Sequence, residues 1–346
     1  MTFSRSIARP SSTAKSRCIA MSASWPPWTP SPLRGPLARH AQAGSLGIAA
    51  IHSSGWRGSH MNQRHLGPGE CRIKQVRRLG AGGLGYVDEV TIIASRHYAL
   101  PRGARFARKQ LHERWAREPT AIERFIREIS TLQRLRHPNI ITIRAVNAPG
   151  GIVPFYVMDL CSQSMRDLLR KRRAPIPLRT VLSWGHALAG ALAYAHEKGV
   201  IHRDIKPENV LLSKQGVPVI ADWGLGYFVH QMSRVLQPLT AAGLGTEYYA
   251  SEEQWRTGKC GVTGDVYSLG ITLAELARGE PMRLATRAVG SGINDEVVPG
   301  TSVGARYFTK VIRRMTFQAP EHRIQSMAEV RNHMRIAAQL LHIRTC

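Results

Sequence analysis

Three groups suited to phosphoryl transfer lie together in the segment from His202 to Asn209, which reads HRDIKPEN. Such a reaction needs a carboxylate that orients a hydroxyl, a cation that meets the charge of the migrating phosphoryl group, and an oxygen ligand for magnesium. Asp204, Lys206 and Asn209 supply one of each. The residue types of this segment therefore suit phosphoryl transfer.

A glycine-rich segment lies upstream, in Leu79–Val87, and reads LGAGGLGYV. Glycine lets a backbone approach a phosphate without a Cβ in the way, so Gly80, Gly82 and Gly85 are candidate nucleotide contacts. The same pattern in front of a helix would indicate a dinucleotide site, and a glycine cluster on its own is often a flexible turn. Residues 86–94 are rich in Val, Ile and Thr, which predicts a strand and therefore favours a β-hairpin lid rather than the N-terminus of a helix.

A lysine and a glutamate between these two segments form a candidate ion pair. Lys109 ends a predicted strand over residues 106–109 and can reach the phosphates of a nucleotide. Glu128 lies in residues 121–135, where apolar residues recur at the period of an amphipathic helix. We expect that helix to bring Glu128 to Lys109, although a carboxylate among several arginines also fits a solvated i,i+4 partner.

A further carboxylate, Asp222, follows an apolar segment and reads with its neighbours as ADWG. A hard divalent cation prefers oxygen ligands, and Asp222 together with Asn209 offers a carboxylate and an amide oxygen. Nucleotide phosphates and water would complete the coordination of Mg²⁺.

These segments follow one another in the order found in protein kinases. Across residues 71–341 the chain resembles a bacterial-type serine/threonine protein kinase, and Lys206, two residues after Asp204, is typical of that branch. Trp223 replaces the usual Phe after the metal-binding aspartate, and residues 251–253 read SEE instead of Ala-Pro-Glu. We expect the larger wedge of Trp223 still to pack.

The resemblance implies an α+β fold with two lobes, a small lobe of antiparallel strands with one helix and a larger, mainly helical lobe. The small lobe would span residues 71–158, the hinge residues 159–161 and the large lobe residues 162–341. ATP, held with Mg²⁺, would bind between the lobes.

The resemblance also implies roles for individual residues. The implied catalytic residues are Asp204, Lys206, Lys109 and Glu128, and the implied magnesium ligands are Asn209 and Asp222. The residues implied to contact ATP are Leu79, Gly80, Gly82, Gly85, Val87, Ala107, Lys109, Met158, Asp159, Cys161 and Leu211. Among these, Met158 would be the gatekeeper, and the backbones of Asp159 and Cys161 would meet adenine.

Control is implied to act through an activation segment, residues 225–245. Arg203, beside the catalytic aspartate, would need an anion for neutralisation, and a phosphate on Thr240 would supply up to about two negative charges. Thr246 is implied to place its hydroxyl between the catalytic aspartate and lysine.

Two structural contacts are implied as well. Glu253 would form an ion pair with the late arginine Arg323. Asp265 would sit at the start of a buried helix and hold the backbone of the catalytic loop by hydrogen bonds.

The formal net charge is +25, and the first sixty residues contribute seven basic residues and no acidic ones. Such a surplus favours acidic partners or a polyanion, although it bears on association rather than on fold. The run Arg170–Arg173 fits a solvated helix end first, and a docking patch for acidic substrates or nucleic acid second. Protein substrates with Ser or Thr acceptors are the expected partners.

Residues 1–60 are rich in Ser, Pro, Ala and Arg and predict no packed domain. They fit a disordered basic extension, an organelle transit peptide, or translation from an upstream start with Met61 as the natural initiator. No apolar run approaches the roughly 18 residues that cross a bilayer, so we expect a soluble, cytoplasmic protein without a membrane span. The five cysteines lie far apart without a CxxC pair, which predicts neither a disulfide framework nor a zinc site.

Three other functions remain open. A pseudokinase scaffold usually lacks the phosphate-binding lysine, the catalytic aspartate or the metal-binding aspartate, and all of these are present here. A small-molecule kinase typically lacks the lysine-proline-glutamate run and the activation segment, which this chain has. Nucleic-acid binding by the basic N-terminal arm is compatible with catalysis and would show as salt-dependent retention on DNA.

Overall fold

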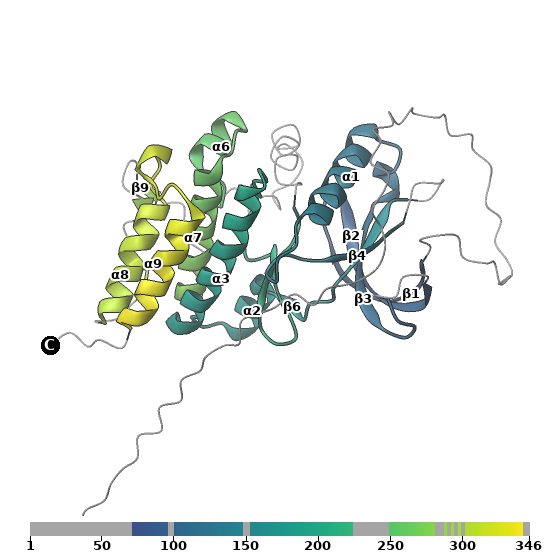
Figure 1. Cartoon of the computed structure of the whole chain (residues 1–346), viewed down its shortest axis with the longest axis horizontal. Coiled ribbons are helices and arrows are strands. Elements are labelled where there is room, and N and C mark those ends of the chain that lie inside the picture. The colour runs from purple at the N-terminus through teal and green to yellow at the C-terminus, as the bar shows by residue number, and fades with distance from the viewer. Residues whose placement is uncertain are drawn as a thin grey trace, which may run out of the picture. The chain divides into compact units, whose positions relative to one another are not determined.

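The computed structural model of the protein describes residues 71–95, 100–147, 153–223, 249–280, 287–288, 292–293, 297–298 and 302–341. All of these residues belong to one compact unit, which spans residues 56–346. Within this unit, a β-sheet lies at one end and a group of helices at the other (Figure 1).

Five antiparallel strands form the first part of the unit, in the spatial order β1-β2-β3-β5-β4. The strands are β1 (Cys71–Ala81), β2 (Gly85–Ser95), β3 (Arg105–Leu111), β4 (Ile143–Asn147) and β5 (Phe155–Met158). The register sets Lys109 of β3 opposite Val87 of β2 and Tyr156 of β5. The lysine therefore lies on the central strand of the sheet, where its neighbours are fixed on both sides.

One helix, α1 (Pro119–Arg134), packs on this sheet after a 3₁₀ turn, η1 (Glu113–Trp115) (Figure 1). Proline starts the helix at a position where its missing N–H leaves no hydrogen bond unmade. The buried residues of the helix are Ala121, Phe125, Glu128, Ile129 and Leu132. The helix expected over residues 121–135 is thus confirmed, and it carries a carboxylate, Glu128, on an otherwise apolar face.

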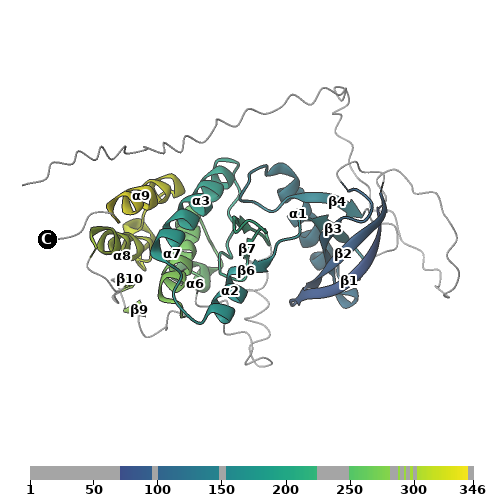
Figure 2. The same cartoon turned by 90° about the horizontal axis from the view of Figure 1, so that it is seen from below.

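Helices dominate the second part of the unit (Figures 1 and 2). The helical elements are α2 (Met165–Arg172), α3 (Leu178–Glu197), α6 (Glu252–Thr257), α7 (Val262–Arg278), α8 (Val303–Met315), η3 (Pro320–His322) and α9 (Met327–Leu340). The short strands are β6 (Gln163–Ser164), β7 (Val210–Leu212), β8 (Pro218–Ile220), β9 (Arg287–Ala288) and β10 (Gly292–Ile293). Among the helices of the described ranges, none is both long and apolar enough to cross a bilayer. The expected α+β class with a sheet lobe and a helical lobe is confirmed.

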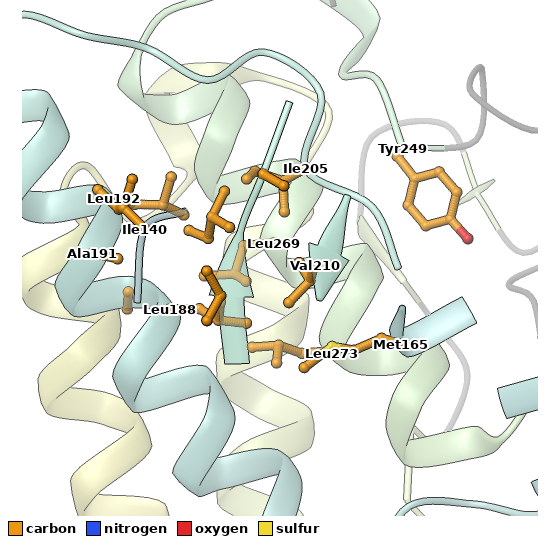
Figure 3. Close-up of a cluster of buried hydrophobic side chains, with 14 of the residues drawn as sticks. Ile140, Met165, Leu188, Ala191, Leu192, Ile205, Val210, Tyr249, Leu269 and Leu273 are labelled. Carbon is orange, nitrogen blue, oxygen red and sulfur yellow. The ribbon is translucent and has the colours of Figure 1, made fainter. Parts of the chain in front are cut away.

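The core of the helical lobe lies where α3, α7 and α9 meet. Figure 3 shows part of it, with the side chains of Leu188, Ala191, Leu192, Leu269 and Leu273. Gly185 of α3 permits this close approach, because a Cβ there would lie 3.1 Å from side-chain atoms of both Leu273 and Met334. The catalytic loop begins shortly after α3, so it starts from a rigid, fully packed base.

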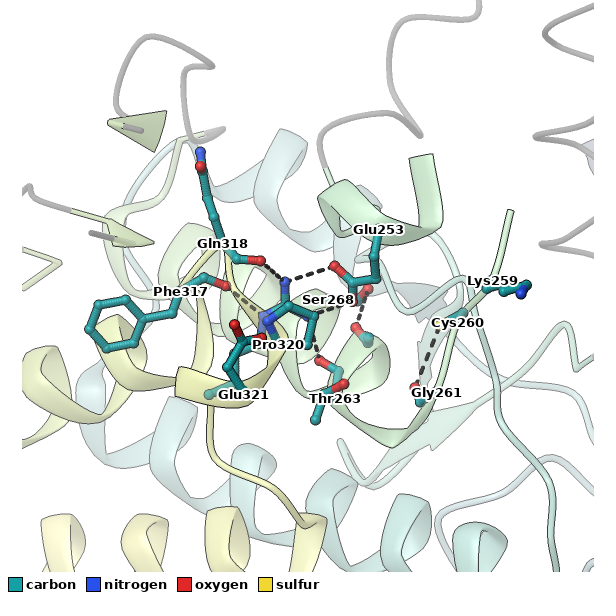
Figure 4. A network of polar contacts seen from close by, with 12 residues as sticks. Glu253, Lys259, Cys260, Gly261, Thr263, Ser268, Phe317, Gln318, Pro320 and Glu321 are labelled. Carbon is teal, nitrogen blue, oxygen red and sulfur yellow. Dashed lines mark hydrogen bonds and ion pairs between the residues drawn. The ribbon is translucent and has the colours of Figure 1, made fainter. Parts of the chain in front are cut away.

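A buried arginine, Arg323, joins the segment after α8 to α6. Figure 4 shows its partners Glu253, Phe317 and Gln318. Its guanidinium donates to both carboxylate oxygens of Glu253, at 2.6 and 2.9 Å. The same group donates to the backbone carbonyls of Phe317, Gln318 and Thr263 at 2.5, 2.6 and 3.2 Å. The expected ion pair is therefore confirmed, although SEE stands in place of Ala-Pro-Glu.

Removal of the Glu253 charge should destabilise the large lobe. In Glu253→Gln the fully buried guanidinium of Arg323 loses its counter-charge. Loss of one partner from a buried pair costs about 3–5 kcal/mol. Because 26% of the glutamate side chain is exposed, we expect a smaller fall in the free energy of unfolding, about 2–3 kcal/mol, measured by urea denaturation at neutral pH.

An exposed pair provides the matched control. Arg127 and Glu123 are each 67% exposed, and Glu123→Gln should change stability by less than about 0.5 kcal/mol. Burial by itself would raise the pKa of Glu253, but the hydrogen bonds and positive charge of Arg323 outweigh burial and lower that pKa. The stability contributed by the pair is therefore lost only as the pH falls through the lowered value. Equal stability of wild type and Glu253→Gln at neutral pH would contradict this account.

Candidate active site

Lys109 lies buried between two carboxylates from different parts of the chain. Its Nζ donates to Glu128 Oε1 of α1 at 2.9 Å and also contacts Asp222 Oδ1, after β8. Tyr156 of β5 donates its hydroxyl to the same Glu128 oxygen at 3.0 Å. The predicted ion pair between Lys109 and Glu128 is therefore present.

The charges of this cluster are set by burial and by the lysine together. Burial by itself would lower the pKa of Lys109, but Asp222 and Glu128 outweigh it and raise that pKa above its ordinary value. Burial raises the pKa of Glu128, and Lys109 offsets only part of that effect. Burial would likewise raise the pKa of Asp222, but Lys109 holds it below its ordinary value. The lysine is thus cationic and Asp222 anionic at neutral pH.

Side chains of the catalytic loop converge on Asp204. Lys206 Nζ and Asn209 Nδ2 each donate to Asp204 Oδ2 at 2.8 Å. Asn209 Nδ2 also donates to the backbone carbonyl of Asp204 at 2.8 Å. These bonds fix the orientation of the amide and leave Oδ1 as its ligand atom. The structure therefore brings together the three loop residues that the sequence singled out.

Asp265 of α7 supports this loop from the core. Its Oδ2 accepts from His202 N at 2.9 Å and its Oδ1 accepts from Arg203 N at 2.8 Å. His196 Nε2 lies 2.8 Å from Oδ2 of the same carboxylate, which is fully buried. Arg203 adopts a left-handed conformation with φ of 71°, unfavourable for a residue other than glycine. The loop depends on Asp265 to hold this conformation, and the expected hydrogen bonds are confirmed.

Asp222 also adopts a left-handed conformation, with φ of 60°, directly before Trp223. The indole of Trp223 is fully buried and packs edge-on against His202, with ring centroids 4.7 Å apart. Its Nε1 donates to the carbonyl of Ile220 at 3.2 Å, and His202 Nε2 lies 2.9 Å from the carbonyl of Ala221. The larger wedge therefore packs, as expected, and fixes the backbone next to the aspartate.

A cleft of about 370 Å³ opens beside these groups, within the range of small-molecule sites. The expected ATP contacts that line it are Leu79, Gly80, Val87, Ala107, Met158, Asp159, Cys161 and Leu211. Asp222 lines it as well, whereas Gly82, Gly85 and Lys109 lie outside this lining. Ala221 N donates to the carbonyl of Asn209 at 2.9 Å, which sets the catalytic loop alongside the cleft.

The glycines of the turn between β1 and β2 have different surroundings. A Cβ at Gly80 would meet nothing within 4 Å, so the fold itself does not require glycine there. A Cβ at Gly85 would collide with the carbonyl oxygen of Gln110, so the contact between β2 and β3 requires glycine at that position. The open space at Gly80 lies on the cleft, where a ligand can approach the backbone.

Side chains from the segment before α1 hold the tip of this turn. His112 Nε2 lies 2.9 Å from the carbonyl of Gly82. Trp115 Nε1 donates to the carbonyl of Gly83 at 2.7 Å, and Arg114 donates to the same carbonyl at 3.3 Å. The turn is thus tied to the connection between β3 and α1, a contact that no sequence motif indicated.

At the expected hinge, Asp159 is held by the neighbouring strand. Its N–H donates to the carbonyl of Thr142 at 3.2 Å, and its carboxylate accepts from Arg144 at 2.6 and 2.7 Å. Because this N–H is engaged, any contact of Asp159 with adenine has to use the carbonyl oxygen. Burial, reinforced by Asp159, raises the pKa of the Cys161 thiol to about 11, so the side chain stays neutral.

Residues 73–336 match the family described as the protein kinase domain, which is three quarters of the chain. The chain belongs to this family. The kinase is 30% identical over 262 residues to the serine/threonine-protein kinase PknB of Mycobacterium leprae, an alignment that covers 72% of this chain and 40% of PknB. It is 33% identical over 221 residues to PknK of Mycobacterium tuberculosis, covering 62% of this chain and 19% of that one. The chain thus spans well under half the length of these curated relatives.

Solved structures show the same likeness. The crystal structure of the Mycobacterium tuberculosis PknI kinase domain aligns with a TM-score of 0.53 and 25% identity, covering 77% of this chain and 96% of that domain. A double mutant of the same domain aligns with a TM-score of 0.56 and 26% identity. The likeness therefore extends over nearly the whole of the neighbour's kinase domain.

The oxygen groups of this kinase fit Mg²⁺. Asp222 places one carboxylate oxygen on Lys109, and 42% of its side chain is exposed. Together with the amide oxygen of Asn209 it gives a hard donor pair, which is common for Mg²⁺ because this ion completes its shell with phosphates and water. Within the described residues no group of three or more His, Cys, Asp or Glu side chains could hold a metal by itself. The donor set is therefore one that relies on a nucleotide.

Two of the expected regulatory residues, Thr240 and Thr246, lie outside the described residues. Arg203 is described and is half-buried, and its backbone carbonyl accepts from Gln254 Nε2 at 2.7 Å. That bond ties the loop to α6. Pairing of the Arg203 guanidinium with a phosphate stays a prediction.

Tyr156 is a site residue that no motif revealed. It belongs to β5 (Phe155–Met158) and lies two positions before Met158. Because side chains alternate along a strand, residues two apart share a face. The alternation could therefore have placed Tyr156 on the same side as the gatekeeper position.

Tyr156→Phe should weaken nucleotide binding without unfolding the protein. The variant keeps the ring that lies 5.5 Å from Phe125 and removes only the hydrogen bond to Glu128. The carboxylate then loses a donor and is less well fixed against Lys109. A buried hydrogen bond to a charged group contributes about 1.5–3 kcal/mol. If part of this free energy is lost from ATP binding, the affinity for ATP should fall about threefold to tenfold. Fluorescence titration with ATP provides the measurement.

Tyr194→Phe is the matched control for this experiment. Tyr194 accepts a hydrogen bond from Arg136 N at 3.1 Å at an exposed contact, and it does not line the cleft. Loss of the Tyr194 hydroxyl should therefore leave the affinity for ATP unchanged. If the two variants bind ATP equally well, the hydroxyl of Tyr156 has no positioning role.

Proposed function

We propose that this chain is an ATP-dependent serine/threonine protein kinase, which transfers the γ-phosphoryl group of Mg-ATP to Ser and Thr hydroxyls of proteins. The observation that carries the proposal is that two polar clusters lie beside one cleft, which Asp222 of the first cluster lines and to which Asn209 of the second is tied through Ala221. Lys109 with its carboxylates forms the first, and Asp204 with Lys206 and Asn209 forms the second. Membership of the protein kinase family and similarity to chains named serine/threonine-protein kinases support it.

The lining of the cleft supports the proposed ATP site. Val87, Ala107 and Leu211 present aliphatic surface suited to the faces of an adenine ring. The hinge, residues 159–161, offers backbone groups to the edge of that ring. Gly80 leaves open space for phosphates beneath the lid, and the ammonium of Lys109 supplies positive charge beside it.

Each group then has a defined part in the transfer. Asp204 orients the acceptor hydroxyl for in-line attack and accepts its proton. Lys206, 2.8 Å from Asp204, offsets the charge on the transferring group, and Lys109 offsets charge on the phosphates. Asn209 and Asp222 would hold Mg²⁺, which would supply positive charge to the phosphate oxygens. The protein contributes position and electrostatic stabilisation rather than covalent chemistry.

We assign the activity to residues 71–341 and treat residues 1–60 as a basic extension outside the catalytic domain. A cytoplasmic place of action is proposed because the reaction consumes ATP. The described cysteines, Cys71, Cys161 and Cys260, are free thiols, as is usual in reducing compartments. Proteins with accessible Ser or Thr residues are the proposed substrates.

Asp204→Asn should abolish phosphoryl transfer while the protein stays folded. The amide can keep hydrogen bonds to Lys206 and Asn209 but cannot accept the hydroxyl proton, and loss of such a group typically costs a factor of about 10²–10⁴. Incubation with labelled ATP, magnesium and a generic protein acceptor measures the rate. Circular dichroism checks the fold.

Glu321→Gln serves as the control for loss of a carboxylate. Glu321 is exposed in η3 and does not line the cleft, so its removal should leave the rate unchanged. Wild-type activity in Asp204→Asn, or an inactive wild type that binds no ATP, would refute the proposed chemistry.

We further propose that the kinase activates itself by phosphorylating Thr240, which lies in the activation segment outside the described residues. A phosphate there would pair with the guanidinium of Arg203 through about one to three charge-assisted hydrogen bonds, and these bonds would order the segment. In Thr240→Ala we expect the phosphate to be absent from the peptide that contains this position, and activity to fall about tenfold. Mass spectrometry and a rate assay after preincubation with ATP test both points. Ser233→Ala, in the same segment, is the control, and full activity of Thr240→Ala would exclude this form of regulation.

A further inference from the structure

A cavity of about 700 Å³ lies beside the catalytic loop and exceeds the proposed ATP cleft in size. Among the described residues its walls come from α2 and the segment after it, the C-terminal end of α7, Tyr249, and Glu208 of the catalytic loop. Glu208 lines both the cavity and the ATP cleft. The two hollows therefore meet at the loop that carries Asp204.

The carboxylates of this cavity are all paired within the protein. Arg166 Nε donates to Glu208 at 2.7 Å, and the same guanidinium pairs with Glu275. Arg278 Nη2 donates to Glu280 at 3.0 Å. Each of the three glutamates that line the cavity is therefore paired with one of two arginines, Arg166 or Arg278.

Glu275 is held most tightly of these carboxylates. It is buried, and it accepts from the hydroxyl of Tyr249, which itself accepts from Arg166 Nη2 at 2.5 Å. Figure 3 shows the Tyr249 hydroxyl pointing away from the aliphatic core. Burial raises the pKa of Tyr249, so the hydroxyl stays a donor. A closed network of this kind leaves the buried carboxylate unsuited to receive a basic side chain from a peptide.

Two further arginines line the cavity without an ion-pair partner among the described residues. Arg170 and Arg173, at the C-terminal end of α2, are exposed, and their side chains have no hydrogen-bond or ion-pair partner among the described residues. Arg173 adopts a left-handed conformation with φ of 50°, and its N–H caps the helix on the carbonyl of Leu169 at 2.9 Å. Glycine would make this turn with less strain, so the turn does not explain the arginine.

A favourable interaction with the helix dipole is the simpler explanation for basic residues at this place. Arg172, at the end of the same helix, already provides such a charge and donates to the carbonyl of Pro175 at 3.1 Å. It does not line the cavity. The dipole accounts for a basic helix end but not for a second and third arginine placed on the wall of the cavity.

We propose that this cavity binds an acidic side chain of the protein substrate, close to the acceptor Ser or Thr, through Arg170 and Arg173. The inference rests on the proposed kinase activity and names the class of substrate that it acts on. Charge complementarity supports it, because the lining carries four arginines against three glutamates, and Arg170 and Arg173 form none of the ion pairs with those glutamates. Since Glu208 borders both hollows, a peptide whose hydroxyl lies at Asp204 has neighbouring residues within reach of the cavity.

A scan of matched peptides tests the preference on the full-length protein. A neutral peptide with one acceptor Ser is compared with versions that carry Glu or Lys at each flanking position in turn. At one or more positions we expect Glu to raise kcat/KM about threefold to tenfold over Ala, mainly through KM, and Lys to lower it. The preference should weaken as salt is added, because the arginines are exposed.

Variants of the two arginines test the assignment. Arg173→Gly removes a charge while the left-handed turn is kept, and should reduce the preference for Glu to about threefold or less. Arg170→Glu reverses a charge, so the Lys peptide should become the better substrate. Arg172→Glu changes the charge of the same helix end outside the cavity, and this control should keep the wild-type preference.

The outcomes separate this inference from the proposed function. Equal rates with Glu, Ala and Lys at every position would overturn the inference and leave the kinase activity standing. A preference that Arg172→Glu reduces as much as Arg170→Glu would also overturn it, because the effect would then come from general positive charge. If no peptide is phosphorylated, the proposed function fails, and fluorescence anisotropy with the labelled Glu and Lys peptides decides the inference alone. Selective binding of the Glu peptide that Arg170→Glu abolishes would support it, and equal binding of both peptides would refute it.

Discussion

The pairing of the Lys109 ammonium with two carboxylates is the interaction on which the rest of the site depends, because one carboxylate comes from the sheet lobe and the other from the helical lobe. Glu128 comes from α1 and Asp222 from the segment after β8. Glu128 is fully buried, and an ionised carboxylate is costly there without a counter-charge. The sheet, its helix and the segment after β8 therefore all meet at one cation.

Local patterns in the sequence predicted those parts of the site that depend on a single helix or strand. The apolar period of residues 121–135 placed Glu128 on the inner face of a helix, and the structure has that helix over Pro119–Arg134. The pairs that cross the large lobe, such as Glu253 with Arg323, were predicted because the chain resembles a known family. Hydrophobic pattern alone would not have paired two residues so far apart in the chain.

The remaining features depend on tertiary contacts that leave no local mark. Arg166 and Glu275 are separated by 109 positions, and nothing in either segment indicates the other. Gly80 and Gly85 look equivalent in the sequence, yet one borders open space and the other is required by a neighbouring strand. The left-handed conformation of Arg203 likewise exists only because the folded lobe supplies hydrogen bonds that offset its strain.

The tie between the glycine-rich turn and the segment before α1 has a mechanical consequence. His112 and Trp115 grip the turn at Gly82 and Gly83, and the same segment leads within a few residues into the helix that carries Glu128. The glycine-rich turn and the start of α1 are therefore linked by hydrogen bonds, so a shift of one would be transmitted to the other and to Glu128.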